Sequence, residues 1–111
     1  MAKLETTLTG SFDEWINRIE SGIINGSVTA ELEDSSDFFS EDGSSRCSVR
    51  VFERYSMIGE NRVSLSVTLF QAAGGPIHCS AISSGGSQAL FFKINTLGEE
   101  AFLEKLEELI V

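Results

Sequence analysis

Two alternating stretches decide the fold: Cys47-Ser48-Val49-Arg50-Val51-Phe52-Glu53-Arg54-Tyr55-Ser56-Met57 and Arg62-Val63-Ser64-Leu65-Ser66-Val67-Thr68-Leu69-Phe70. Apolar and polar residues alternate in both, a period that is typical of strands with one buried face. Gly59-Glu60-Asn61 separates them, which predicts an antiparallel hairpin with a three-residue turn. This turn would pair Met57 with Val63, Tyr55 with Leu65 and Val51 with Leu69. The odd-numbered residues of both strands are therefore expected to face the core.

Further strands flank this hairpin. Alternation predicts strands over 4–8 and 28–33, and the second is followed by an acidic stretch over 34–45 that we expect to be a loop. Another strand is expected over 77–83. Residues 89–94 form either a sixth strand or an extended segment that crosses the sheet.

Two capping boxes mark the helices. Ser11 with Glu14 begins the first helix, and Gly22 or Asn25-Gly26 ends it. Its apolar face consists of Phe12, Trp15, Ile16 and Ile19. Thr96 with Glu99 begins a second helix at the C-terminus. The apolar face of that helix consists of Phe102, Leu103, Leu106, Leu109 and Ile110.

The predicted order is β-α-β-β-β-β-(β)-α in a single domain, residues 1–111. It indicates a two-layer α+β fold, in which both helices cover one face of an antiparallel sheet of five to six strands. This element order is similar to that of TBP-like repeats and of small helix-grip proteins. The segments Ser80-Ala81-Ile82-Ser83-Ser84-Gly85-Gly86-Ser87-Gln88 and Phe91-Phe92-Lys93-Ile94-Asn95-Thr96 resemble a family of small uncharacterised bacterial proteins. That resemblance implies no known activity.

The composition excludes several classes of partner. A net charge of −9 argues against binding to nucleic acid and to anionic membranes. No apolar run approaches the ~20 residues that a membrane span needs. The first residues have no apolar core of a secretory signal, so we expect a cytoplasmic protein. Cys47 and Cys79 are then expected to be buried thiols without a disulfide. Two Cys and one His at distant spacings predict neither a metal site nor a cofactor.

The Ser/Gly-rich segment 83–88 is a candidate binding loop. Its backbone N–H groups and hydroxyls could surround an anion or a polar ligand, with Ser84, Gly85, Gly86, Ser87 and Gln88 as the binding residues. The alternative is a plain connection between strands, where Ser and Gly are the usual residues.

A second candidate pocket lies between the sheet and the helices. In the expected register Glu53 and Tyr55 point toward the core, and a carboxylate there would need a partner or a cavity. Such a cavity would hold a small ligand. The alternative is that Glu53 reaches solvent or an arginine.

The outer sheet face is a candidate interface. In the expected register Arg50, Phe52, Arg54 and Phe70 share this face, and Arg50 lies opposite Phe70. Exposed Phe and Arg are favoured in protein interfaces. The alternative is a solvated face on which arginine stems cover two aromatic rings.

No catalytic motif is present. His78 and Cys79 are neighbours on a strand and point to opposite faces, so they cannot form a nucleophile–base pair. We therefore expect a non-catalytic interaction module that forms a homodimer through its sheet face or binds another protein. The alternative function is binding of a small polar ligand or anion. A third alternative is an enzyme, whose site would have to be assembled from Ser, Glu and Tyr without a histidine.

Overall fold

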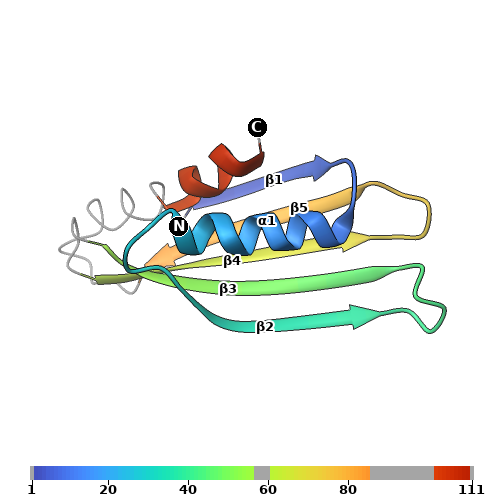
Figure 1. The fold of residues 1–111 in the computed structure, drawn as a ribbon, viewed down its shortest axis with the longest axis horizontal. Helices are drawn as coiled ribbons and strands as arrows, with labels where there is room; N and C mark the ends of the chain where they lie inside the picture. Colours follow the sequence, from blue (N-terminus) through green and yellow to red (C-terminus); the bar gives the residue numbers. More distant parts are fainter. Residues whose placement is uncertain (1, 57–60, 86–101, 111) are drawn as a thin grey trace.

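The computed structural model describes residues 2–56, 61–85 and 102–110, and it confirms the α+β fold and the order of its elements (Figure 1). The elements are β1 (Ala2–Leu8), α1 (Phe12–Asn25), β2 (Glu31–Phe39), β3 (Arg46–Ser56), β4 (Asn61–Gln71) and β5 (Ile77–Gly85). A C-terminal helix spans 102–110. The possible sixth strand at 89–94 lies outside the described residues.

The five strands form one antiparallel sheet in the order β1-β5-β4-β3-β2. The central strand is β4, and β1 and β2 are the edges. Both helices lie on the same side of this sheet (Figure 1). No described helix or strand covers the opposite side, which we call the bare face.

Helix α1 forms where the capping box predicts. Ser11 is the N-cap, and its hydroxyl accepts a hydrogen bond of 3.3 Å from the backbone N–H of Glu14. The helix continues through Gly22 and ends at Gly26. Its buried side chains are Phe12, Ile16, Ile19 and Ile23. Trp15 is partly buried, and its indole N–H donates to the carbonyl of Thr9 at 2.7 Å.

The C-terminal helix packs against α1 at Gly22. Phe102, Leu103 and Leu106 join the same buried cluster as the core residues of α1 and the sheet. The side chain of Leu109 occupies the space that a Cβ atom on Gly22 would need. Glycine at this position therefore allows the two helices to approach closely.

The prediction for β2 was wrong in its bounds. The strand begins at Glu31 rather than residue 28, and it continues to Phe39 through the stretch expected to be a loop. A bulge between Leu32 and Asp34 shifts its register against β3. Pairing with β3 outweighs the low strand propensity of Asp and Ser in this segment.

The register of the central hairpin was also wrong. Tyr55 pairs with Arg62 rather than with Leu65, and Leu65 pairs with Phe52. Val51 pairs with Ser66 instead of Leu69. The even-numbered residues of β3 consequently face the helices, together with the odd-numbered residues of β4. Phe52, which has no exposed surface, is the residue of β3 that fills the core.

Candidate functional site

The predicted Arg–Phe interface does not lie on one surface. Phe52 is fully buried and Arg50 is 8% exposed, and both face the helices. Arg54 is partly buried on the same side. Phe70 is 42% exposed and lies on the bare face, where it pairs with Cys47 rather than with Arg50. The expectation that these four residues share an exposed face was wrong, because it depended on the register of β3.

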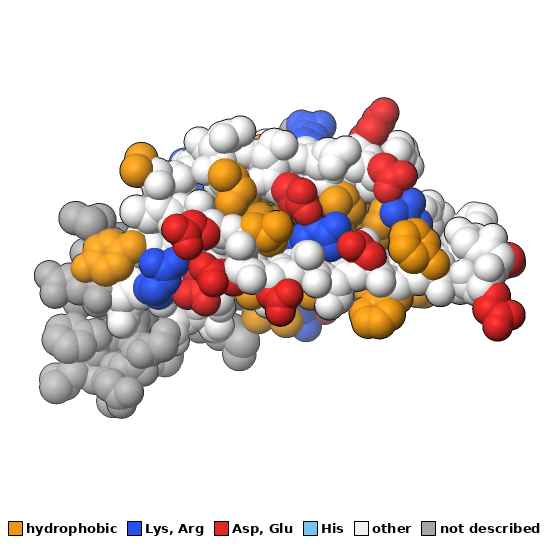
Figure 2. Space-filling view, turned by 60° about the horizontal axis from the view of Figure 1, so that its bottom comes forward, with side chains coloured by type: hydrophobic (Ala, Val, Ile, Leu, Met, Phe, Trp, Pro, Cys, Tyr) orange, Lys and Arg blue, Asp and Glu red, His pale blue; other side chains and the backbone are white. Residues whose placement is uncertain are grey.

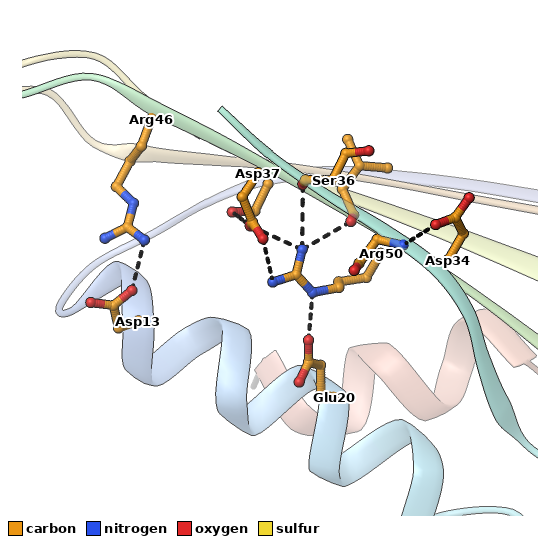
Figure 3. Close-up of polar contacts among 10 residues, drawn as sticks. Asp13, Glu20, Asp34, Ser36, Asp37, Arg46 and Arg50 are labelled. Atoms are coloured by element: carbon orange, nitrogen blue, oxygen red, sulfur yellow. Dashed lines mark hydrogen bonds and ion pairs between the residues drawn. The ribbon is translucent and has the colours of Figure 1, made fainter. Parts of the chain in front are cut away.

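Arg50 lies at the centre of a polar network beneath α1 (Figure 3). Its Nε donates to Glu20 of α1, and its Nη1 donates to Asp37 of β2 at 3.0 Å. Ser48 donates to the same Asp37 carboxylate at 2.5 Å. The hydrogen bond from Ser48, and then that from Arg50, lowers the pKa of Asp37 below its usual value. Because two carboxylates neutralise the guanidinium, a nearly buried arginine is tolerated here.

Arg46 makes a similar contact with α1, at a residue two turns before Glu20. Its Nη2 donates to Asp13 at 2.7 Å, and its guanidinium lies over the Phe12 ring, 4.2 Å from the ring centre. Figure 2 looks toward the β2 edge and shows basic side chains with acidic side chains beside them. These contacts connect α1 to β2 and β3, so we assign Arg46 and Arg50 a structural role.

Arg54 has different surroundings. Its guanidinium lies over the ring of Phe102, 4.6 Å from the ring centre. Asp13 and Glu20, the partners of Arg46 and Arg50 on α1, are seven residues apart. A third carboxylate at this spacing would be at position 27, which lies beyond the end of α1, so the helix offers Arg54 no equivalent partner. Burial lowers the pKa of Arg54. The aromatic ring is thus its main contact within the described residues.

The predicted binding loop is described only in part. Ser84 and Gly85 belong to β5, and the hydroxyl of Ser84 lies 2.8 Å from that of Ser64 on β4. Gly86, Ser87 and Gln88 lie outside the described residues. The anion-binding loop therefore stays a prediction.

Glu53 and Tyr55 do not line a pocket between sheet and helices. Both are odd-numbered residues of β3 and point to the bare face. The carboxylate of Glu53 accepts a hydrogen bond of 3.0 Å from Nε of Arg62. The interpretation that Glu53 reaches an arginine is confirmed, and the placement toward the core was wrong.

The bare face consists of the odd-numbered residues of β1 and β3, the even-numbered residues of β4 and β5, and four residues of β2: Glu31, Asp34, Ser36 and Phe38. Among the described residues, seven large hydrophobic side chains are exposed, and four of them lie here: Phe38, Tyr55, Phe70 and Ile82. Cys47, Val49 and Val51 add partly exposed surface next to them. A gathering of exposed apolar side chains on one face is typical of a binding site.

One end of the bare face contains a shallow hollow of about 570 Å³. Strands β1, β4 and β5 line it with Glu5, Thr6, Thr7, Thr68, Phe70, His78, Cys79 and Ser80. The rings of Phe70 and His78 stack with their centres 6.3 Å apart. Sequence reasoning missed this hollow because it depends on the register.

Sequence reasoning also missed Ile82, although a signal was present. The inward-facing residues of β5 are every second one: Ile77, Cys79, Ala81 and Ser83. This alternation places Ile82, an apolar residue, on the outer side of the sheet.

Comparison with known proteins places this chain in a family. The model of a family of unknown function, DUF6054, matches residues 1–111. The chain belongs to DUF6054. No curated protein and no solved structure matches it. This membership agrees with the resemblance to a family of small uncharacterised proteins.

The DUF6054 family supplies no activity, so functional inference starts from the surface of the fold. In the described part of this DUF6054 chain, no helix is long and apolar enough to cross a membrane. Within residues 2–56, 61–85 and 102–110, no three His, Cys, Asp or Glu side chains gather where they could hold a metal ion.

Proposed function

We propose that this chain is a non-catalytic interaction module that forms a homodimer through the bare face of its sheet. The supporting observation is the apolar surface formed by Phe38, Phe70 and Ile82 together with Val49 and Val51. Small side chains between them, such as Ser66 and Thr68, would let a second sheet approach to the usual spacing of about 10 Å.

The size of the sheet is consistent with this function. At about 4.8 Å between strands and about 3.4 Å per residue, a sheet of this size presents roughly 700 Å² on one face. A standard interface buries about 800 Å² on each partner. A second copy of the sheet, packed face to face, would thus bury nearly the area of a standard interface on each partner.

Sedimentation equilibrium over a concentration series tests the proposal with two matched variants. Ile82→Asp places a charge on the bare face, and Val28→Asp places the same charge at a fully exposed residue outside it. We expect the wild type and Val28→Asp to dimerise at micromolar concentration, and Ile82→Asp to weaken the dimer at least tenfold. A wild type that stays monomeric at several hundred micromolar would overturn the proposal. Equal behaviour of the two variants would also overturn it.

The hollow on the same face favours a second candidate function, binding of a small polar ligand. The hydroxyls of Thr68 and Ser80 bond to no other described residue, and the Phe70–His78 pair offers an aromatic wall. Such a site suits a neutral ring with hydroxyl or amide groups, because the carboxylate of Glu5 is already paired with Lys3 at 2.7 Å. Native mass spectrometry of gently purified protein tests it. A mass above that of the chain, absent after denaturation and lost in His78→Ala, supports ligand binding.

A further inference from the structure

We infer that the two copies of the dimer pack with β4 over β4 of the partner, related by a two-fold axis that runs along this strand. The inference rests on the proposed homodimer and specifies its geometry. It follows from the order of the strands and from the side chains that face outward in each row across the sheet.

Face-to-face packing leaves two simple orientations for the axis. A two-fold axis that relates opposed sheets lies in the plane between them, either along the strands or across them. Because β4 is the central strand, an axis along it places β1 over the partner's β2 and β5 over the partner's β3. An axis across the strands instead places each edge over its own counterpart.

One row of the bare face is complementary to itself under the first orientation. From edge to edge it contains Lys3, Ile82, Ser66, Val51 and Asp34. When the row meets its reversed copy, Lys3 faces Asp34 and Ile82 faces Val51. At both edges of the interface Lys3, which pairs with Glu5 of its own chain, therefore also meets a carboxylate of the partner, and apolar side chains meet between these edges.

A second row, which lies beyond the row of Thr68, also fits this orientation. It contains Thr7, His78, Phe70, Cys47 and Phe38. Phe70 lies on the central strand, so the two copies of its ring meet near the axis. Paired aromatic rings with centres about 4.5–7 Å apart stabilise such contacts beyond the area that they bury.

The second orientation brings like charges together. The outward residues of β2 include Glu31 and Asp34 and no basic residue. An axis across the strands would place this acidic edge over the acidic edge of the partner, which is unfavourable. The charges on the edges thus select the axis along β4.

The twist of the sheets does not remove the edge contact. Aligned sheets cross at about 30°, which moves strands two places from the axis by roughly 5 Å, or one to two residues. Glu31 is the outward residue of β2 next to Asp34, so a shift in that direction keeps Lys3 opposite a carboxylate. Both Lys3 and Asp34 are exposed, and their substitution leaves the core unchanged.

Charge reversal tests the axis. Sedimentation equilibrium at about 50 mM salt would compare the wild type with Lys3→Glu, Asp34→Lys and the double variant. We expect each single variant to raise the dissociation constant roughly threefold to tenfold and the double variant to restore it. Asp34→Lys decides between the axes, because an axis across the strands predicts that this change relieves repulsion and strengthens the dimer. The matched control is Glu14→Lys, which makes the same kind of change on the exposed surface of α1.

The outcomes separate this inference from the proposed function. A wild type that never dimerises overturns both. A dimer that is weakened by Ile82→Asp but strengthened by Asp34→Lys, or not restored in the double variant, overturns the axis and leaves the bare face as the interface. A short bifunctional thiol reagent gives an independent measurement in a Cys47→Ser background. Phe70→Cys should cross-link with itself, whereas Ile82→Cys should cross-link only when mixed with Val51→Cys.

Discussion

Arg50 on β3 and Asp37 on β2 form a two-armed ion pair, with Nη1 to Oδ1 at 3.0 Å and Nη2 to Oδ2 at 3.4 Å. The same guanidinium donates to Glu20 on α1. All nine residues of β2 are exposed, so this strand gains little from burial. The ion pair therefore adds a side-chain contact to the backbone pairing with β3 that holds this edge strand in the sheet.

Replacing Arg50 should loosen this edge. Arg50→Met leaves the carboxylates of Asp37 and Glu20 without their cation and should lower the free energy of unfolding by about 2 kcal/mol. Urea denaturation measures it, and hydrogen exchange should show faster exchange in β2. Arg62→Met is the matched control, because Arg62 is an exposed arginine with carboxylates nearby, and its effect should be smaller. A larger effect of Arg62→Met would contradict this role of Arg50.

The Asp37 carboxylate should make stability depend on pH. The hydrogen bond from Ser48, followed by that from Arg50, lowers the pKa of Asp37 in the folded state. A lowered folded-state pKa contributes stability above the unfolded value of about 3.9, and this contribution is lost as the pH falls through the folded pKa. The pH profile of Asp37→Asn should therefore be flatter than that of the wild type below about pH 4. Asp42, whose pKa is lowered to about 2 by Ser40 and then Ser44, contributes equally to both proteins. Parallel profiles would contradict the prediction.

The contact between Gly22 and Leu109 predicts a coupling between two substitutions. Gly22→Ala should favour the helix by up to about 1 kcal/mol, but the new methyl group overlaps the Leu109 side chain. In a Leu109→Ala background this overlap is absent, so Gly22→Ala should be clearly more stabilising there than in the wild type. Thermal denaturation of the four proteins in the cycle measures the coupling. Additive effects would show that the C-terminal helix does not pack at Gly22.

Phe52 and Phe70 should respond differently to truncation. Phe52→Ala removes a fully buried ring and should cost about 3–5 kcal/mol of stability. Phe70→Ala removes an exposed ring and should leave the stability of the monomer within about 0.5 kcal/mol while weakening self-association. Denaturation below the dimer dissociation constant separates the two effects. A high cost for Phe70→Ala in the monomer would contradict the observed register.

The two thiols should differ in reactivity. Burial raises the pKa of the Cys79 thiol to about 11, so little thiolate is present at pH 8. Cys47 is partly exposed on the bare face. Iodoacetamide at pH 8 should therefore alkylate Cys47 well before Cys79, which should react only on unfolding. Mass spectrometry of the peptides reads this directly, and slower labelling of Cys47 at high protein concentration would indicate coverage of the bare face.

Local patterns in the sequence were sufficient for the order of the elements. The capping box at Ser11, the apolar face of α1 and the alternation in β4 depend on neighbours in sequence, and the structure has all three. The register of β3 could not be predicted in this way. Val49, Val51 and Tyr55 look like a core row, and Arg50 and Arg54 look like a solvent row.

The structure reverses these rows because the charges find partners from distant segments. Arg50 meets Glu20 and Asp37, which lie 30 and 13 residues away, and Arg54 meets the ring of Phe102. A signal for this arrangement was present, since Asp13 and Glu20 lie seven residues apart beside the apolar face of α1. The same reversal moved the candidate interface from the predicted Arg–Phe row to the row of Ile82 and Val51.

The acidic edge strand has a consequence for the size of the assembly. Among the described strands, β2 has an outer edge of nine residues that pairs with no other strand, and it carries Glu31, Glu33, Asp34 and Asp37. An exposed edge of this length is a template for open-ended strand addition, the route to fibrils. Two such edges repel each other through their carboxylates, so sheets cannot grow sideways by β2 pairing with β2. In the proposed dimer, each copy covers the bare face of the other, so growth by stacking would stop at two copies.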